Sequence, residues 1–211
     1  DGAGVDTRWL RRLTGVPTGT AFIQVDSRGE NTIVVVQGAN AHVALPVGDV
    51  EPRVVVTQNE IPPAAQQEAV ALAARTGARL VINAAPAPES PPPWYSAADP
   101  LVVNEHEAAQ LATSDEAGAG LLRQLWERTG ARSVVMTLGE RGALVDDGTE
   151  VHAIPPVVVE QVVDATGAGD TFVGVLAARL ARGDAVVAAA SAANRCAAKA
   201  VTWPGARPPA G

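Results

Sequence analysis

The sequence predicts an α/β fold in which a doubly wound, mainly parallel sheet is flanked by helices. Three observations lead to this prediction. Short apolar runs such as Leu101-Val102-Val103 have the length of strands that are buried on both faces. A strand, a helix and a second strand follow one another within residues 53–83, which is the pattern of a right-handed crossover between parallel strands. Aromatic residues make up only 3% of the chain, while Ala, Val and Gly are abundant, as suits closely packed layers.

Composition and charge narrow the classes of function. The 211 residues are 47% hydrophobic and 18% charged, which is typical of one globular domain. The net charge is −7 and no run of Lys and Arg occurs, so we expect neither a nucleic-acid partner nor a membrane partner. The single cysteine, Cys196, excludes an internal disulfide and suits a reducing compartment, so the expected location is the cytoplasm.

The N-terminal quarter of the chain predicts a small β unit. Residues 1–17 have mixed character and could form a short helix through Val5, Leu10 and Leu13. Two strand-like runs follow at 20–25 and 32–36, and the segment Asp26-Ser27-Arg28-Gly29 between them predicts a hairpin turn.

The next elements predict a parallel sheet. A strand at 53–57 precedes an Ala-rich helix that Gly77 should end, and a second strand follows at 80–83. Glu60 and Asn83 come after these strands, at the sheet edge where parallel sheets bind their ligands. Pro91-Pro92-Pro93 is expected to be a rigid surface loop.

The second half continues the alternation of strands and helices. We expect strands at 101–103 and 133–137, a hairpin of 142–145 with 150–153, and helices at about 116–128 and 184–200. Leu121, Leu122, Leu125 and Trp126 should form the core face of the first of these helices. Asn104 should begin another helix as its N-cap, followed by acidic residues in the first turn, with His106 exposed.

The stretch 157–172 carries the strongest chemical signal. The apolar run Val157–Val163 predicts a buried strand, and Phe172, Val175, Leu176 and Leu180 then recur at helical spacing. A small-residue turn between a strand and a helix leaves backbone N–H groups unpaired at the positive end of the helix dipole. This is an anion site, and the carboxylate of Asp170 is out of place there unless the chemistry needs a base.

The string Asp164-Ala165-Thr166-Gly167-Ala168-Gly169-Asp170-Thr171-Phe172 resembles the C-terminal signature of the ribokinase-like (PfkB) family of sugar kinases, closest to its ribokinase subgroup. The resemblance runs from about Thr18 to Ala206, and it implies a ribokinase-like fold with a small β lid at about 17–40. It also implies that 1–211 is one domain whose N-terminal segment, roughly eighty residues or half a domain, would precede Asp1.

The resemblance implies a role for each matching residue. Asp170 would be the catalytic base and would contact the substrate together with Glu60, and Gly167, Ala168 and Gly169 would form an anion hole. The nucleotide would lie against Asn104, Thr137, Leu138, Gly139, Glu140, Arg141, Gly142, Gly169 and Asn194. Asn104 and Glu107 share a helix face and would hold Mg²⁺ through water, although a purely structural cap is the alternative. A monovalent cation such as K⁺ would lie near Asp164, Thr166, Ala200, Trp203 and Gly205, although Trp203-Pro204 departs from the family's usual residues.

The activity that the resemblance implies is ATP-dependent transfer of the γ-phosphoryl group to a primary hydroxyl of a pentose, D-ribose above all. Kinases of fructose, of a nucleoside or of another polyol remain alternatives, as does an inactive fragment that only binds nucleotide or sugar. The expected partners are ATP and a small sugar, with a homodimer formed through the lid.

Overall fold

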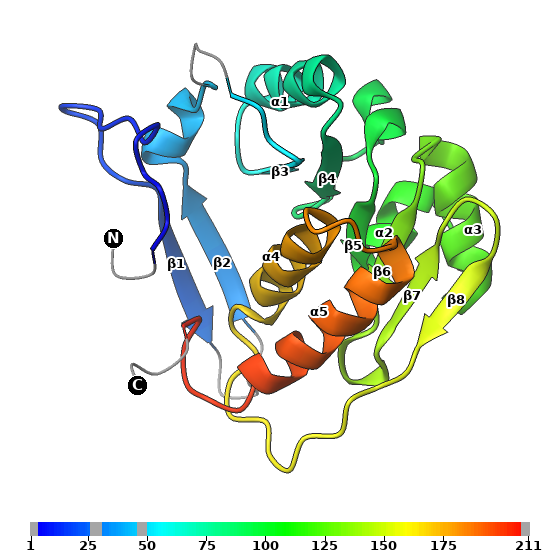
Figure 1. The fold of residues 1–211 in the computed structure, drawn as a ribbon. Helices are drawn as coiled ribbons and strands as arrows, with labels where there is room; N and C mark the ends of the chain where they lie inside the picture. The colour runs from blue at the N-terminus through cyan, green and yellow to red at the C-terminus, as the bar shows by residue number, and fades with distance from the viewer. Residues whose placement is uncertain (1–3, 26–30, 46–49, 208–211) are drawn as a thin grey trace.

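The computed structural model describes residues 4–25, 31–45 and 50–207, and the predicted turn at 26–29 lies outside them. A six-stranded sheet with helices on both faces forms the main body, and a separate two-stranded sheet lies to one side of it (Figure 1). Four strands of the large sheet are parallel and the last two are antiparallel, which confirms the predicted α/β fold class. In sheet order the strands are β3 Val54–Gln58, β4 Arg79–Asn83, β5 Leu101–Asn104, β6 Val134–Thr137, β7 Ala143–Asp146 and β8 Val151–Ile154.

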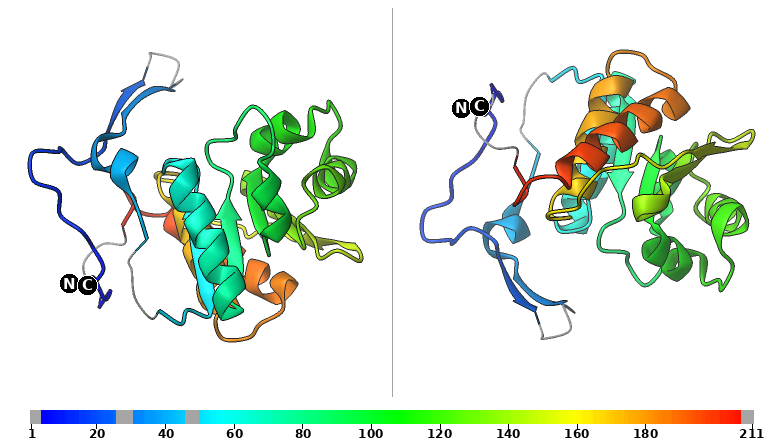
Figure 2. Two further views of the ribbon diagram at one scale, coloured as in Figure 1. Left: turned by 90° about the horizontal axis from the view of Figure 1, so that it is seen from above. Right: turned by 90° about the horizontal axis from the view of Figure 1, so that it is seen from below.

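Helices cover the two faces of this sheet in separate groups (Figure 2). One face packs against α1 Pro63–Thr76, α2 Glu105–Ala112 and α3 Gly118–Thr129. The other face packs against α4 Ala168–Leu180 and α5 Val186–Ala200. Three short 3₁₀ segments complete the described part: η1 Gly38–His42, η2 Pro93–Ala97 and η3 Gly139–Arg141. The proline-rich segment at 91–93, predicted as a loop, therefore leads directly into η2.

Strand β4, which lies between β3 and β5, shows why the apolar runs form this sheet. Leu80 and Ile82 belong to the core beneath α1, α2 and α3, whereas Val81 belongs to the core beneath α4 and α5. Their exposed fractions are 2%, 0% and 0%. Because alternate residues of a strand point to opposite faces, an uninterrupted apolar run is what a sheet covered on both sides requires.

The C-terminal end of α1 confirms the sequence prediction. Pro63 occupies the first turn, where its missing N–H costs no hydrogen bond. Gly77 follows the helix with φ 70°, and its N–H donates to the carbonyl of Ala73. This left-handed conformation favours glycine because a Cβ atom is unfavourable there.

The two-stranded sheet consists of β1 Thr20–Val25 and β2 Asn31–Val36, which pair antiparallel. The two strands match the predicted hairpin, and the side chains of Phe22 and Val34, which are register partners, are 62% and 58% exposed. The short helix predicted within residues 1–17 is wrong. Residues 4–17 form turns and loops, with Val5 and Leu10 about two-thirds exposed, because no second layer covers them.

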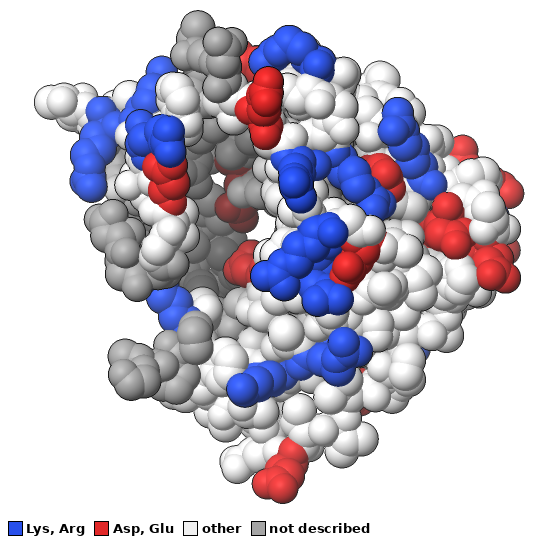
Figure 3. Space-filling model, viewed as in Figure 1, with Lys and Arg blue, Asp and Glu red and all other residues white. Residues whose placement is uncertain are grey.

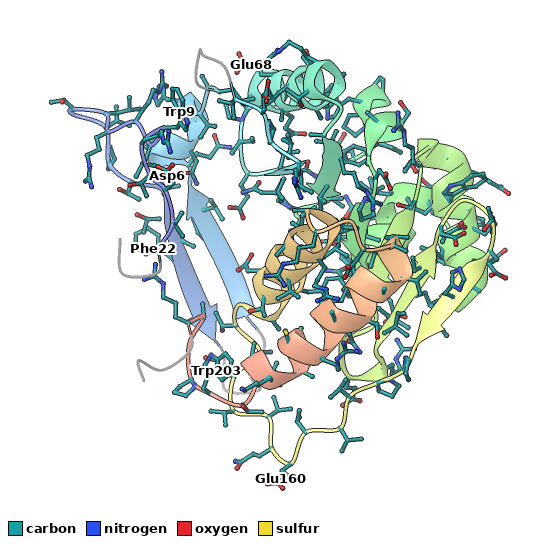
Figure 4. All side chains as sticks on the ribbon, viewed as in Figure 1. Asp6, Trp9, Phe22, Glu68, Glu160 and Trp203 are labelled. Atoms are coloured by element: carbon teal, nitrogen blue, oxygen red, sulfur yellow. The ribbon has the colours of Figure 1, made fainter. Side chains whose placement is uncertain are left out.

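The buried strand predicted at Val157–Val163 is also wrong. This segment pairs with no strand and joins β8 to α4 as a mostly exposed loop. Val158 is 93% exposed, and Glu160 lies at the outermost point of the loop (Figure 4). The apolar residues have a different purpose, because Val157, Val159 and Val162 line a cavity instead of a sheet core.

Asp147, in the turn of the β7–β8 hairpin, gives a pH-dependent prediction. The hydroxyl and N–H groups of Thr149, the N–H of Glu150 and the ring of His152 donate to its carboxylate and hold its pKa well below the ordinary 3.8. A lowered folded-state pKa stabilises the fold above about pH 4, and that contribution is lost as the pH falls further.

We therefore expect Asp147→Ala to lower the free energy of unfolding by about 1 kcal/mol at pH 7. The difference from the wild type should shrink below pH 4, as measured by urea unfolding at several pH values. Glu150→Gln, which alters a more exposed carboxylate of the same turn, should have little effect. A gap that stayed constant with pH would contradict this account.

Candidate functional site

Three of the predicted site residues lie at or just beyond the carboxyl ends of the parallel strands. Asn104 ends β5 and Thr137 ends β6, and the two are paired in the ladder, which places them about 4.8 Å apart as neighbours across two strands. Glu60 lies two residues beyond the end of β3. This is the edge of the sheet at which the fold class places its ligands.

A cavity of about 440 Å³ opens beside this edge. Its walls come from the segment after β6, the 155–165 loop, the start of α4 and the last turns of α5. Residues of the predicted nucleotide site and anion hole meet there: Thr137, Gly139, Glu140, Gly142, Ala168, Gly169 and Asn194. The remaining lining residues were not predicted as site residues: Val157, Val159, Val162, Ala165, Phe172, Ala197, Ala198 and Val201.

The glycine loop after β6 is shaped by its backbone. The N–H of Leu138 donates to the carbonyl of Gly142 at 2.8 Å, which closes the loop on itself. Gly142 has φ 90° and ψ −133°, a region that essentially only glycine adopts. A Cβ atom at this position would collide with the carbonyl of Ile154. Glycine here therefore lets the loop pack tightly against the end of β8.

Three residues predicted to contact the nucleotide do not line the cavity: Asn104, Leu138 and Arg141. Leu138 is the N-cap of η3, and Arg141 pairs through its guanidinium with the carboxylate of Glu105 at the start of α2. Arg141 thus ties the glycine loop to the neighbouring helix. The sequence spacing allowed Arg141 to face either the nucleotide or the neighbouring helix. The carboxylate of Glu105 explains why it faces the helix.

The N-terminus of α4 offers the unpaired N–H groups that the sequence predicted. Gly167 precedes the helix with φ 79°, and its carbonyl accepts the first helical hydrogen bond, from Thr171, at 2.9 Å. Within the described residues, the N–H groups of Gly167, Gly169 and Asp170 have no backbone partner, whereas that of Ala168 donates to Ala165 at 3.2 Å. Gly169 lines the cavity and the Asp170 side chain is exposed beside it. The site can therefore hold an anion next to a free carboxylate.

Asp164 fixes the turn that precedes α4. Its two carboxylate oxygens accept the N–H groups of Thr166 and Gly205, each at 2.8 Å. The Thr166 hydroxyl and these N–H groups lower the pKa of Asp164, so the carboxylate is charged. Two of the residues predicted around a monovalent cation, Asp164 and Gly205, thus meet directly. Trp203 lies in the loop that follows α5 (Figure 4).

Asn104 and Glu107 form a complete capping box. The Asn104 side chain accepts the N–H of Glu107 and the Glu107 carboxylate accepts the N–H of Asn104, both at 2.8 Å. Burial raises the pKa of Glu107, and the hydrogen bond from Asn104 offsets part of this effect. The helix cap that was the alternative to a magnesium role for this pair is therefore present. Each side chain nevertheless keeps one oxygen lone pair or more for a hydrated cation. No cluster of three or more His, Cys, Asp or Glu residues suited to a metal occurs among the described residues.

Glu60 is exposed and does not line the nucleotide-type cavity. Its N–H donates to the side chain of Gln58, which holds the turn after β3.

A hollow separates the two-stranded sheet from the main body, and acidic side chains are visible inside it (Figure 3). Lys and Arg side chains are visible on the outer surface of this face, over α4 and α5 and also beside the two-stranded sheet.

Comparison with known proteins settles the family. The family model described as pfkB family carbohydrate kinase matches residues 1–210. The chain belongs to the pfkB family. Mouse ribokinase is 36% identical to it over 190 residues, which cover 84% of this chain and 58% of that enzyme. The chain thus spans little more than half the length of this pfkB relative.

Solved pfkB-type structures agree with the fold described above. Ribokinase from Thermotoga maritima is 30% identical and superposes with a TM-score of 0.78, covering 90% of this chain and 65% of that one. Ribokinase from Cryptococcus neoformans, solved in complex with ADP, is 27% identical with a TM-score of 0.82, covering 97% and 72%. The ribokinase-like fold predicted from the sequence is confirmed.

Across the described ranges, no helix has the length and apolar character needed to cross a membrane.

Proposed function

We propose that this chain carries the nucleotide site and the catalytic base of an ATP-dependent sugar kinase, which transfers the γ-phosphoryl group to a primary hydroxyl of a pentose, D-ribose above all. One observation carries the proposal. The glycine loop after β6, the N-terminus of α4 and Asn194 of α5 line one cavity, and Asp170 directly follows the lining residue Gly169 in the first turn of α4. Among the relatives, mouse ribokinase supports ribose as acceptor, and the ADP complex of the Cryptococcus enzyme supports the nucleotide.

In this proposal the chemistry is mainly positioning and electrostatics, as is usual for phosphoryl transfer. The N–H groups of Gly167 and Gly169 stabilise the negative charge that develops on the transferred group. The Asp170 carboxylate accepts the proton of the attacking sugar hydroxyl. Glu60 accepts hydrogen bonds from other sugar hydroxyls.

The residues fit the cations that the family implies. Asn104 and Glu107 offer oxygens that suit a hydrated Mg²⁺, which would neutralise charge on the phosphates. The charged carboxylate of Asp164, with the Thr166 hydroxyl and the carbonyls of Ala200, Trp203 and Gly205, suits a monovalent cation. We also propose that the apolar two-stranded sheet, with Phe22 and Val34 exposed, pairs two copies in a homodimer, which the mass of the chain in solution tests.

Two measurements test the function. Calorimetry with ATP should show binding to the 211-residue chain, and a coupled assay of ADP release should show which of ribose, fructose and adenosine is phosphorylated. Failure to bind ATP would overturn the proposal. Binding of ATP without phosphorylation of any acceptor would favour the alternative of a nucleotide-binding fragment.

The magnesium role of Glu107 gives a separate prediction. Glu107→Gln keeps a side-chain oxygen for the capping box and removes only the charge. We expect turnover to fall about 10- to 100-fold, the usual cost of losing an outer-shell partner of a metal, with a higher Mg²⁺ requirement and little loss of ATP affinity. Magnesium titrations of the variant would measure this. The neighbouring variant His106→Gln, at an exposed position, should behave as the wild type. An unchanged magnesium dependence in Glu107→Gln would leave that residue with a structural role only.

A further inference from the structure

The turn after β3 carries Glu60, which the proposed function places against the sugar. The Glu60 side chain is exposed, and within the described residues its carboxylate takes part in no hydrogen bond or ion pair. The direction of this side chain is therefore set by the backbone of the turn. A group that must meet a ligand in one geometry depends on neighbours that hold its backbone in place.

Asn59, the residue before Glu60, ties this turn to the loop that follows β4. Its backbone N–H donates to the carbonyl of Ala85 at 3.2 Å. Its Nδ2 atom donates to the carbonyl of Pro86 at 2.7 Å and to the hydroxyl oxygen of Tyr95 at 2.8 Å. A carbonyl can only accept a hydrogen bond, so rotating the amide by 180° would bring two oxygen atoms together. The side chain of Asn59 is thus held in one orientation.

The partners of Asn59 are themselves held in place. Tyr95 belongs to the core beneath α1, α2 and α3 and is 0% exposed, so its ring is fixed by packing. The loop after β4 is also bound from its other side. Gln110 of α2 donates through Nε2 to the carbonyls of Ala87 and Pro88, at 3.2 and 3.3 Å. The loop therefore offers Asn59 a fixed anchor.

We propose that Asn59 is a positioning residue of the kinase, which holds the turn after β3 against the loop of residues 85–88 and against Tyr95, so that Glu60 meets the sugar. The inference rests on the proposed function, which gives Glu60 its contact with the sugar, and adds the residue that fixes this contact. Asn59 does not line the nucleotide cavity. Its loss should therefore weaken the use of the sugar and leave the use of ATP unchanged.

Steady-state kinetics of Asn59→Ala test the inference. Alanine keeps the N–H that donates to Ala85 and removes the amide. For the sugar that the wild type phosphorylates, we expect KM to rise about tenfold, as misplacing one hydrogen-bonding group implies, with KM for ATP unchanged. Gln67→Ala truncates an exposed amide of α1 and should leave both constants as in the wild type. An unchanged KM for the sugar in Asn59→Ala, or equal rises for sugar and ATP, would overturn the inference.

A double-mutant cycle shows whether Asn59 acts through Glu60. In a Glu60→Ala background the carboxylate is absent, so Asn59→Ala should lower kcat/KM for the sugar no further. Additive effects of the two changes would overturn the positioning role. Should Asn59→Ala fail to fold, as shown by circular dichroism, Tyr95→Phe removes only the hydroxyl partner. It should raise the sugar KM by a smaller factor, and this rise should also vanish in Glu60→Ala.

The same assays separate this inference from the proposed function. A wild type that phosphorylates none of the offered sugars would overturn both together. An active wild type whose sugar KM does not respond to Asn59→Ala would overturn the positioning role alone.

Discussion

Replacing Asp170 with Asn should lower turnover by about 10²–10⁴ while ATP binding is retained, which is the usual contribution of a general base. The asparagine keeps the shape of the side chain but cannot take the proton of the sugar hydroxyl. Its effect on the fold should be small, because a carboxylate in the first turn of α4 contributes only about 0.3–1 kcal/mol through the helix dipole. A rate loss of 10²–10⁴ corresponds to about 3–5 kcal/mol, which this stability change cannot produce.

The measurement is steady-state ADP release with saturating sugar, alongside calorimetry with ATP. Glu160→Gln is the matched control, because Glu160 is exposed at the outermost point of the loop before α4. It should leave both quantities unchanged. Near-normal turnover in Asp170→Asn would remove this residue from the role of base.

Replacing Gly142 with Ala should be among the most destabilising single changes in the molecule. The residue occupies a glycine-only backbone region, and an added Cβ would meet the carbonyl of Ile154 at the end of β8. Strain of this kind costs about 1–3 kcal/mol, and displacing packed backbone costs a further 1–3 kcal/mol. We therefore expect a loss of about 2–6 kcal/mol in the free energy of unfolding.

Gly139→Ala is the control for this change, because it isolates the backbone strain. Gly139 also has a positive φ, of 58°, but nothing lies within 4 Å of where its Cβ would be. Its replacement should cost about 1 kcal/mol. Urea unfolding measures both variants, and equal losses would show that the packing against Ile154 is unimportant. Since the next residue after Ile154 is Pro155, whose carbonyl accepts a hydrogen bond from the Asn194 side chain, Gly142→Ala should also weaken ATP binding more than Gly139→Ala does.

The sequence prediction failed where an apolar segment could pack either in a sheet core or against a cavity. Val157, Val159 and Val162 have the composition of a buried strand, yet they form one wall of a cavity. A run of valines indicates only that these side chains favour apolar surroundings. It does not record whether a sheet, a helix or a ligand lies opposite. The same limit applies to Ala197 and Ala198, whose small size suits both helix packing and a cavity wall.

The sequence by itself determined the strands and helices of the main body, because their signals are local. Apolar runs buried on both faces, such as 80–82 and 101–103, and glycine at the end of α1 need no knowledge of distant residues. It also predicted an anion site at 167–170, because a glycine turn before a helix leaves N–H groups unpaired whatever the helix packs against. Only the tertiary structure decided what these local features meet. It paired Arg141 with Glu105, joined Asp164 to Gly205, and turned the Asn194 amide toward Pro155. Each of these contacts joins residues far apart in the chain, and their directions depend on packing that no local pattern encodes.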